Sequence, residues 1–308
     1  MKIAIDVGYG DVKVKAGDKL FKFTNAISFV SNSTVNYESD LSVFKYNGDE
    51  YLVGDEALSR KPFITRDFSY LVEFAPLLVY KALKMAGAIP EDDIQLITGL
   101  SLKDWDKKVQ FGSALTSIFV NDELFKIKPQ NIKLVPQGKG VYLDYKSTND
   151  LAPENDYLAI VDIGFNTFDF LVFKNGSTVK EYNYANTHGV NAIVTEISKV
   201  LNREYPVHFS EQEIKDFLNT KQVRIGSQIH DISSIVQKEV SRYCKLTKNE
   251  IQSKNPELLH RAYKIIISGG GAYILADNNI QMFDHQDYCQ TPHEFANVRG
   301  YFLELSND

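Results

Sequence analysis

The sequence predicts an α/β fold built from two similar lobes, and a repeated segment is the main reason. Residues 5–13 read IDVGYGDVK and residues 161–169 read VDIGFNTFD. Each copy follows an apolar segment typical of a buried strand, and each places an aspartate and then a glycine where that strand ends. Alternating segments follow both copies and run into hairpin signals at Gly17 and Gly176. The same order of strand, loop, strand and turn in both halves indicates a duplication.

Length and composition agree with this architecture. The chain has 308 residues, and at roughly 150 residues per domain this length predicts about two domains. The formal net charge is −6 and no dense Lys/Arg run occurs, so direct nucleic-acid binding is not expected. No apolar run reaches the ~18 residues of a membrane span. The two cysteines lack metal-ligand partners at useful spacing and are expected to be reduced structural thiols.

The first lobe is predicted over residues 1–156, with a small subdomain at about 24–92. Because the chain enters a strand directly after Met1, we expect no signal peptide, no membrane-binding extension and a cytoplasmic location. The expected elements are a first sheet at 2–23, a polar loop at 28–40, a hairpin at 44–52 through Asn47-Gly48, a helix at 76–86 stopped by Gly87, and buried strands at 94–98 and 132–137.

The second lobe is predicted over residues 157–308, after a polar hinge at 148–156, with a small subdomain at about 190–262. The C-terminal helix is expected to pack back on the first lobe. The other expected elements are an amphipathic helix at 190–201, a mainly helical and charged segment at 209–259, and a strand at 265–268 followed by three glycines and a helix.

The two repeated loops have the chemistry that a Mg-nucleotide requires. A carboxylate at a strand end, Asp6 or Asp162, can accept hydrogen bonds from metal-bound water, and a tight turn brings backbone N–H groups close to phosphate oxygens. One such turn is usually an ordinary end of a strand, but two of them could grip one nucleotide. The residues concerned are Gly8, Tyr9, Gly10 and Asp11 in the first loop and Gly164, Phe165, Asn166 and Thr167 in the second.

A third glycine-rich segment has two interpretations. Gly269, Gly270 and Gly271 follow a buried-strand pattern and precede an expected helix. Such a turn can simply connect the strand to the helix. It can also let the backbone approach a flat or charged ligand closely. Its position after both aspartate loops favours ligand binding.

On these residues the chain resembles the actin-like ATPases, and among them the ParM-type bacterial and archaeal actins. The segment around Asp6 resembles the first phosphate motif, with Lys13 seven residues on. The segment from Asp162 resembles the second, D-x-G-x-x-T-x-D, and the three glycines resemble the adenosine motif. Residues 295–301 are similar to the A-N-x-x-G ending of plasmid-segregation actins. The first loop departs from the family, because it has Tyr9-Gly10-Asp11 where many actins have small hydroxyl residues.

The resemblance implies a ribonuclease H-like, duplicated actin fold with a nucleotide cleft, ATP or ADP and Mg²⁺ as cofactors, and defined roles. Gln137, at a strand end, matches the family's hydrolytic residue that positions the attacking water. Asp6 and Asp162 would act in catalysis by holding Mg²⁺ through water, and Lys13 would neutralise phosphate. The start of the helix at Gly189 could point N–H groups at phosphate. Weaker candidates for adenosine contact are Glu196, Lys221 and Arg224, since exposed helix charges usually form a solvated face.

The function that the resemblance implies is ATP-driven polymerisation. A filament of this chain with itself would assemble with ATP, hydrolyse it and disassemble, to segregate plasmid or other DNA through an adaptor protein. A small-molecule kinase of the same superfamily is the alternative, although no second polar cluster suggests a sugar or carboxylate site. A cytoskeletal scaffold without DNA cargo is a third possibility.

Overall fold

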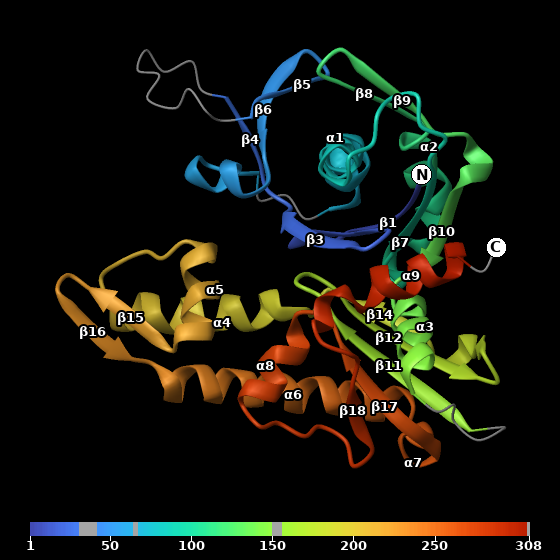
Figure 1. The fold of residues 1–308 in the computed structure, drawn as a ribbon. Coiled ribbons are helices and arrows are strands. Elements are labelled where there is room, and N and C mark those ends of the chain that lie inside the picture. The colour runs from blue at the N-terminus through green and yellow to red at the C-terminus, as the bar shows by residue number, and fades with distance from the viewer. Residues whose placement is uncertain (31–41, 64–66, 150–155, 307–308) are drawn as a thin grey trace. The chain divides into compact units, whose positions relative to one another are not determined.

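The computed structural model of the chain describes residues 1–30, 42–63, 67–149 and 156–306. The chain divides into two compact units. Unit 1 comprises Met1–Asn149 and Phe295–Asp308, and unit 2 comprises Asp150–Glu294. The C-terminal segment therefore belongs to unit 1, although it follows unit 2 in the sequence (Figure 1). Most of the predicted polar loop at 28–40 and of the predicted hinge at 148–156 lies outside the described residues.

Unit 1 is built on a five-stranded sheet with the order β10-β7-β1-β2-β3. Its strands are β1 (Lys2–Val7), β2 (Asp11–Ala16), β3 (Lys19–Thr24), β7 (Gln95–Leu100) and β10 (Ile132–Pro136). The first three are antiparallel neighbours, whereas β1, β7 and β10 run parallel. The carboxyl ends of these three parallel strands therefore lie at one edge, which brings Asp6 and Gln137 to the same place.

Outside its five-stranded sheet, unit 1 is arranged around helix α1 (Phe68–Ala86) (Figure 1). Figure 1 shows it end-on, with strands of unit 1 around it. The turn between β5 (Phe44–Tyr46) and β6 (Asp49–Val53) is the predicted one, and both Asn47 and Gly48 have positive φ angles, of 51° and 91°. The strands outside the main sheet are β4 (Ile27–Phe29), β5 (Phe44–Tyr46), β6 (Asp49–Val53), β8 (Ser117–Val120) and β9 (Glu123–Lys126).

The predicted start of this helix, at Pro76, is wrong. The helix begins at Phe68, because the side chain of Asp67 caps it by accepting the N–H of Tyr70 at 2.9 Å. Pro76 lies inside the helix, where it can donate no backbone hydrogen bond. Burial of the surrounding apolar side chains outweighs that loss. The predicted stop is confirmed, since Gly87 ends the helix in the left-handed conformation with φ 94°.

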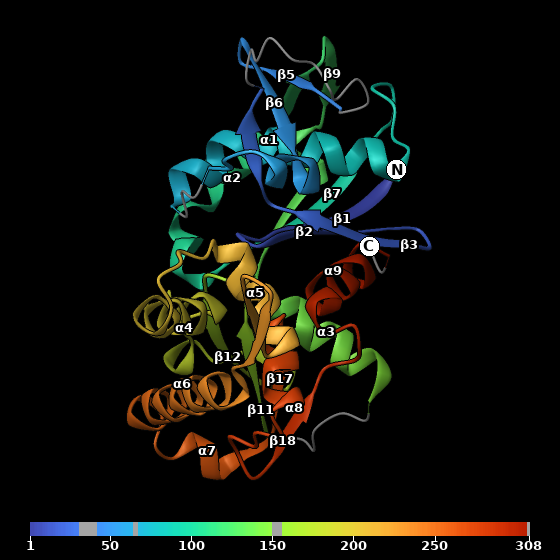
Figure 2. The same cartoon turned by 90° about the vertical axis from the view of Figure 1, so that its left-hand side faces the viewer.

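The other α-helices in the described residues of unit 1 are α2 (Lys108–Ala114), α3 (Lys139–Thr148) and α9 (Ala296–Ser306). Helices α3 and α9 lie side by side in both views (Figures 1 and 2), although about 150 residues separate them in the sequence. Short 3₁₀ helices in the chain are Gly54–Ser59, Leu102–Lys107, Pro129–Asn131, Lys180–Tyr182 and His293–Phe295.

Unit 2 repeats the sheet of unit 1. Its strand order is β13-β12-β11-β17-β18, and β14 also pairs with β12. As in unit 1, the aspartate-bearing strand has an antiparallel neighbour on one side and a parallel one on the other. The predicted duplication is therefore confirmed. The strands are β11 (Tyr157–Ile163), β12 (Phe168–Lys174), β13 (Ser177–Thr178), β14 (Tyr184–Asn186), β17 (Ala262–Ser268) and β18 (Gln286–Tyr288).

The helices of unit 2 are α4 (Val190–Glu204), α5 (Glu211–Thr220), α6 (Ser233–Lys254), α7 (Leu258–Arg261) and α8 (Gly271–Asp277). The prediction of a mainly helical segment at 209–259 missed a hairpin. Strands β15 (Gln222–Ile225) and β16 (Gln228–Asp231) pair there through a turn at Gly226, whose φ is 59°. These strands are short and largely exposed, so their apolar alternation is weak.

Each unit has its own apolar core. Phe111, Phe125 and Leu78 are fully buried in unit 1, and Phe168 and Phe170 are buried in unit 2. Cys244 and Cys289 are buried thiols, and burial raises the pKa of Cys244 to about 12. None of the helices in the described part of the chain combines the length and hydrophobicity of a membrane span.

Candidate functional site

The turn between β1 and β2 forms the first predicted loop. Asp6 lies one residue before the end of β1, is 3 % exposed, and faces Lys13 across the antiparallel pair. The N–H of Gly8 donates to the carbonyl oxygen of Asp11 at 3.2 Å and closes the turn. This geometry places a buried carboxylate directly before a tight backbone turn.

Within the part of the chain that the structure describes, Asp6 has two side-chain partners, and one of them is far away in the sequence. Gln137 Nε2 donates to Asp6 Oδ1 at 2.7 Å, and Lys13 Nζ lies 3.6 Å from Asp6 Oδ2. A methyl group at Gly8 would lie 3.0 Å from Lys13 Nζ, so glycine leaves room for the lysine. The structure thus brings together three predicted charged or polar residues and the predicted glycine. The contact between Gln137 and Asp6 was not predicted.

Asn25 holds this loop in place through hydrogen bonds from its side chain and its backbone, and the sequence did not predict this role. Its Nδ2 donates to the carbonyl of Gly8 at 2.8 Å, and its backbone N–H donates to the carbonyl of Gly10 at 2.9 Å. Tyr70 donates its hydroxyl to Asn25 Oδ1 at 3.2 Å. The two loop carbonyls are therefore directed at Asn25, so they do not face an anion bound on the other side. Because Asn25 follows an ordinary strand, no local signal marks it.

Tyr9 and Asp11 occupy the positions where the family often has small hydroxyl residues. The Tyr9 hydroxyl is buried and has no hydrogen-bond partner among the described residues. Burial, together with the charges of Asp104 and Asp67, raises its pKa far above the usual value, so the phenol stays neutral. Asp11 Oδ2 lies 3.7 Å from Lys22 Nζ in a half-exposed pair. Asp11 carries a negative charge, so a phosphate contact of this loop would come from its backbone or from the neutral Tyr9 hydroxyl, which can donate.

The turn between β11 and β12 has the same geometry in unit 2. Asp162 is 7 % exposed, and Gly164 donates its N–H to the carbonyl of Thr167 at 2.9 Å, as Gly8 does to Asp11. The residue that faces Asp162 across the pair is Asp169, at the position that corresponds to Lys13. The two loops are therefore alike in backbone but differ in charge.

The start of α4 supports the second loop and does not present its first N–H groups to a phosphate, contrary to our expectation. The N–H of Val190 donates to the carbonyl of Gly164 at 3.0 Å, and that of Asn191 donates to Phe165 at 2.8 Å. A methyl group at Gly189 would lie 2.5 Å from the Gly164 carbonyl oxygen. Gly189 is therefore needed so that the helix can approach the loop closely.

The three glycines after β17 have different environments. Gly269 has φ +78°, and a methyl group on it would lie 2.7 Å from Asp162 Oδ1. A methyl group at Gly271 would lie 2.6 Å from Cβ of Ile163, whereas one at Gly270 would meet nothing within 4 Å. Gly269 and Gly271 thus let α8 cross the end of β11, and Gly270 is the position that leaves open space. Unit 2 brings Asp162, the second loop, Gly189 and these glycines together.

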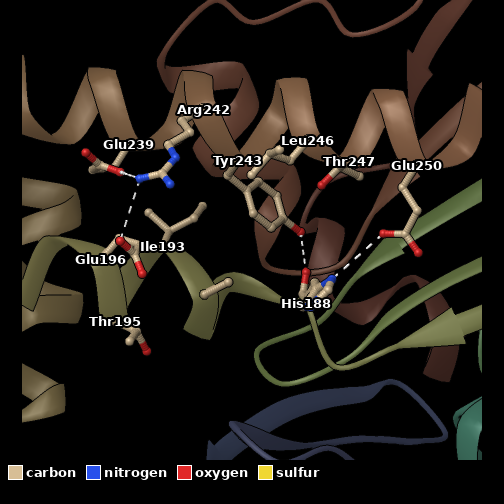
Figure 3. Close-up of a pocket in the computed structure, with 11 residues that line it drawn as sticks. His188, Ile193, Thr195, Glu196, Glu239, Arg242, Tyr243, Leu246, Thr247 and Glu250 are labelled. Carbon is tan, nitrogen blue, oxygen red and sulfur yellow. Dashed lines mark hydrogen bonds and ion pairs between the residues drawn. The ribbon is translucent and has the colours of Figure 1, made fainter.

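Glu196 and Lys221 form no hydrogen bond or ion pair with the glycine loops among the described residues. Glu196 lines a cavity of about 480 Å³ between α4 and α6 (Figure 3). Glu196 Oε1 lies 2.7 Å from Lys199 Nζ, and Glu196 Oε2 lies 3.7 Å from Arg242 Nη1. The hydrogen bond from Lys199 holds the pKa of the Glu196 carboxyl below the usual range. Lys221 ends α5 with φ 55°, and Arg224 is exposed on β15.

The residues of each loop, taken by itself, fit a hydrated Mg²⁺ better than a fully protein-bound metal. In the described part of the chain, no three His, Cys, Asp or Glu side chains are placed to hold a metal ion. Mg²⁺ usually keeps several waters and takes one or two carboxylates plus phosphate oxygens. Asp6 and Asp162 are suited to that role. The hydroxyl of Ser268, paired in register with Asp162, is buried without a hydrogen-bond partner among the described residues, which suits a polar ligand nearby.

Two family models match the chain. Residues 4–140 match the N-terminal domain of actin-like proteins, and residues 160–279 match the C-terminal domain of the archaeal MreB-like actin homologue. These segments include both loops and the three glycines. A search of the curated proteins gave no match.

Solved structures similar to this chain include ParM proteins and an archaeal actin homologue. A ParM from a 15-stranded filament of Clostridium botulinum has 23 % identity and a TM-score of 0.83, with 100 % of this chain and 99 % of that chain covered. Ta0583, an archaeal actin homologue, has 18 % identity and a TM-score of 0.84 at the same coverage. A complex of Ta0583 with ADP has a TM-score of 0.82 at 18 % identity, again with 100 % and 99 % covered. At these identities the similarity establishes the fold.

Proposed function

This chain belongs to the actin-like proteins and has their fold, and we propose that it binds and hydrolyses Mg-ATP and polymerises into filaments. The observation that carries nucleotide binding is the repeated turn. Asp6 and Asp162 are buried at equivalent strand positions, and the glycine two residues later makes the same hydrogen bond in each unit. A duplicated turn with a buried carboxylate matches what a Mg-phosphate requires.

We assign each role from the resemblance to actin-like proteins, and the geometry of the residue supports it. Asp6 and Asp162 would accept hydrogen bonds from metal-bound waters, and Lys13 would offset phosphate charge. Mg²⁺, when bound, would neutralise charge that develops on the phosphoryl oxygens. Gln137 would orient the attacking water: its Nε2 donates to Asp6, which leaves Oε1 as the end that can accept a hydrogen bond from water. Gly270 would accommodate the adenosine.

Filament formation is supported by family membership and by the similar structures. One similar structure is a ParM filament, and another is an archaeal actin homologue with ADP. We extend both properties to this chain. Segregation of plasmid or other DNA is the proposed use of the filament. An adaptor protein would supply the DNA contact, because the net charge of −6 does not favour direct nucleic-acid binding.

Titration of Mg-ATP into isosteric variants tests the nucleotide site. Asp6→Asn and Asp162→Asn should each weaken binding by roughly 10-fold or more, since a hydrogen bond to a charged group contributes about 1.5–3 kcal/mol. Asp18→Asn, at an exposed residue in the β2–β3 turn, is the matched control. If both folded variants keep wild-type affinity, the two-loop assignment is wrong.

A further inference from the structure

The C-terminal helix α9 is held against α3 by direct contact between the two backbones. A methyl group at Gly300 would overlap the carbonyl oxygen of Gly140, and one at Gly140 would lie 2.7 Å from Cα of Asn297. Only glycine at both positions permits this approach. Tyr301, fully buried, fills the space beside Gly99 on β7. Helix α9 therefore touches α3, which begins two residues after Gln137, and β7, whose Leu100 carbonyl accepts the N–H of Gln137.

Asn297 reaches from α9 to the residue after Gln137. Its side chain is 6 % exposed, and its Oδ1 accepts the backbone N–H of Gly138 at 2.9 Å. Gly138 has φ 87° and immediately precedes α3. On the other side, the N–H of Gln137 donates to the carbonyl of Leu100 at 2.8 Å. The backbone is thus fixed at Gln137 and at the next residue.

An ion pair keeps α9 in this position. Arg299 Nε and Nη2 donate to Asp144 Oδ1 and Oδ2 of α3 at 2.8 and 2.6 Å, a two-point contact that resists sliding and rotation. Both side chains are largely buried. Since Asn297 is two residues from Arg299 on the same helix, the ion pair also fixes the place from which Asn297 reaches Gly138.

We propose that Asn297 is a positioning residue for Gln137. By holding the N–H of Gly138, it fixes the turn from which the Gln137 amide reaches Asp6. The Asp6 carboxylate can only accept, so a fixed turn leaves Gln137 Oε1 available to the attacking water. This role rests on the proposed hydrolysis of ATP. It gives the A-N-x-x-G segment at the C-terminus a function in the site.

Kinetics of Asn297→Ala and Asn297→Asp test this role. Loss of the acceptor in Asn297→Ala should lower kcat by about 10- to 100-fold, the scale of a small misplacement of a reacting group, with little change in the KM for ATP. Asn297→Asp keeps an oxygen acceptor and should recover most of kcat. In a Gln137→Ala background, Asn297→Ala should cause no further loss, because the residue to be positioned is gone. Asn202→Ala, at an exposed asparagine of α4, is the control.

A measurement without nucleotide separates this proposal from the proposed function. The Gly138 amide should lose protection from hydrogen exchange in Asn297→Ala and keep it in Asn297→Asp, and the side-chain amide NMR signal of Gln137 should shift only in the alanine variant. These results are expected even if the protein proves not to hydrolyse ATP. An unmoved Gln137 signal in Asn297→Ala, or an equal fall in kcat with and without Gln137, would overturn the positioning role.

Discussion

Asp6 and Asp162 occupy equivalent positions, but the residues that face them differ in charge. Asp6 faces Lys13, so unit 1 carries a cation beside its carboxylate. Asp162 faces Asp169, and both are largely buried. Like charges directly opposite each other on a sheet are unfavourable unless a cation or hydrogen-bond donors balance them. Each of these two aspartates has further interaction partners in the structure, so the charge around Asp162 is set by more than this pair.

The buried pair of Asp144 and Arg299 gives a prediction at the residue scale. Burial raises the pKa of the Asp144 carboxyl above its ordinary value, although the hydrogen bonds and charge of Arg299 act to lower it. Arg299→Ala would remove that lowering and leave a buried carboxylate without its cation. Breaking a buried pair in this way costs about 3–5 kcal/mol at neutral pH.

The sign of the pH dependence follows from linkage. A carboxyl whose folded pKa is raised contributes stability that is fully present below the unfolded pKa, near 4, and is lost as pH rises through the folded pKa. The melting temperature of Arg299→Ala should therefore lie closer to wild type at pH 4 than at pH 7. Asp144→Asn in the same background should remove that dependence. A deficit that is equal at both pH values would contradict the account.

At the scale of elements, the strands and their loops could be predicted because their signals are local. Each of these signals is contained in a segment of about ten residues or fewer: the alternation of β2, the Asn47-Gly48 turn, and each copy of the aspartate-glycine turn. The predicted helix at 76–86 is shorter than α1, because proline is typical of the first turn of a helix, whereas α1 is capped at Asp67 and contains Pro76 in its interior. The hairpin β15–β16 was missed because four-residue exposed strands carry little pattern.

The residues that hold the first loop and the turn after Gln137 in place could not be predicted, because their contacts join segments that are distant in the sequence. Asn25 reaches back 17 residues to Gly8, and Asn297 reaches 159 residues to Gly138. Asn25 does not stand out in its own segment by type or spacing. Asn297 belongs to the A-N-x-x-G ending, but that motif gives no sign of the contact with Gly138. Gln137 could be placed at a strand end from its sequence, yet its contact with Asp6 follows only from the parallel order of β1, β7 and β10.

The crossing of α3 and α9 gives a prediction at the element scale. A methyl group at Gly300 would overlap the Gly140 carbonyl oxygen, so Gly300→Ala should force the helices apart. Overpacking of this kind typically costs about 1–3 kcal/mol, more than the small gain in helix propensity. Thermal unfolding followed by circular dichroism would measure it. Ser306→Ala, at an exposed residue of the same helix, is the control and should melt like wild type. Equal melting temperatures for the two variants would show that the helices adjust at no cost.

At the scale of the whole molecule, the duplication explains why each unit carries half of the proposed machinery. The strand orders β10-β7-β1-β2-β3 and β18-β17-β11-β12-β13 place an aspartate loop at the same point in both sheets. Each unit also has its own core. The two units differ in the residues that they would contribute to the proposed site: Lys13 and Gln137 lie in unit 1, and the three glycines lie in unit 2.

The filament and kinase hypotheses differ in how the activity depends on protein concentration. Both require ATP. Head-to-tail contacts between identical subunits make an open assembly, whose formation has a threshold that a monomeric kinase lacks. With Mg-ATP and no small-molecule acceptor, light scattering and pelleting should show no polymer below a critical concentration and a linear rise above it, with phosphate release rising at the same point. Gln137→Ala should polymerise at a similar threshold and persist longer, because slower hydrolysis delays disassembly. If the protein remains monomeric at tens of micromolar, and consumes ATP only when a sugar or carboxylate is added, it is a kinase.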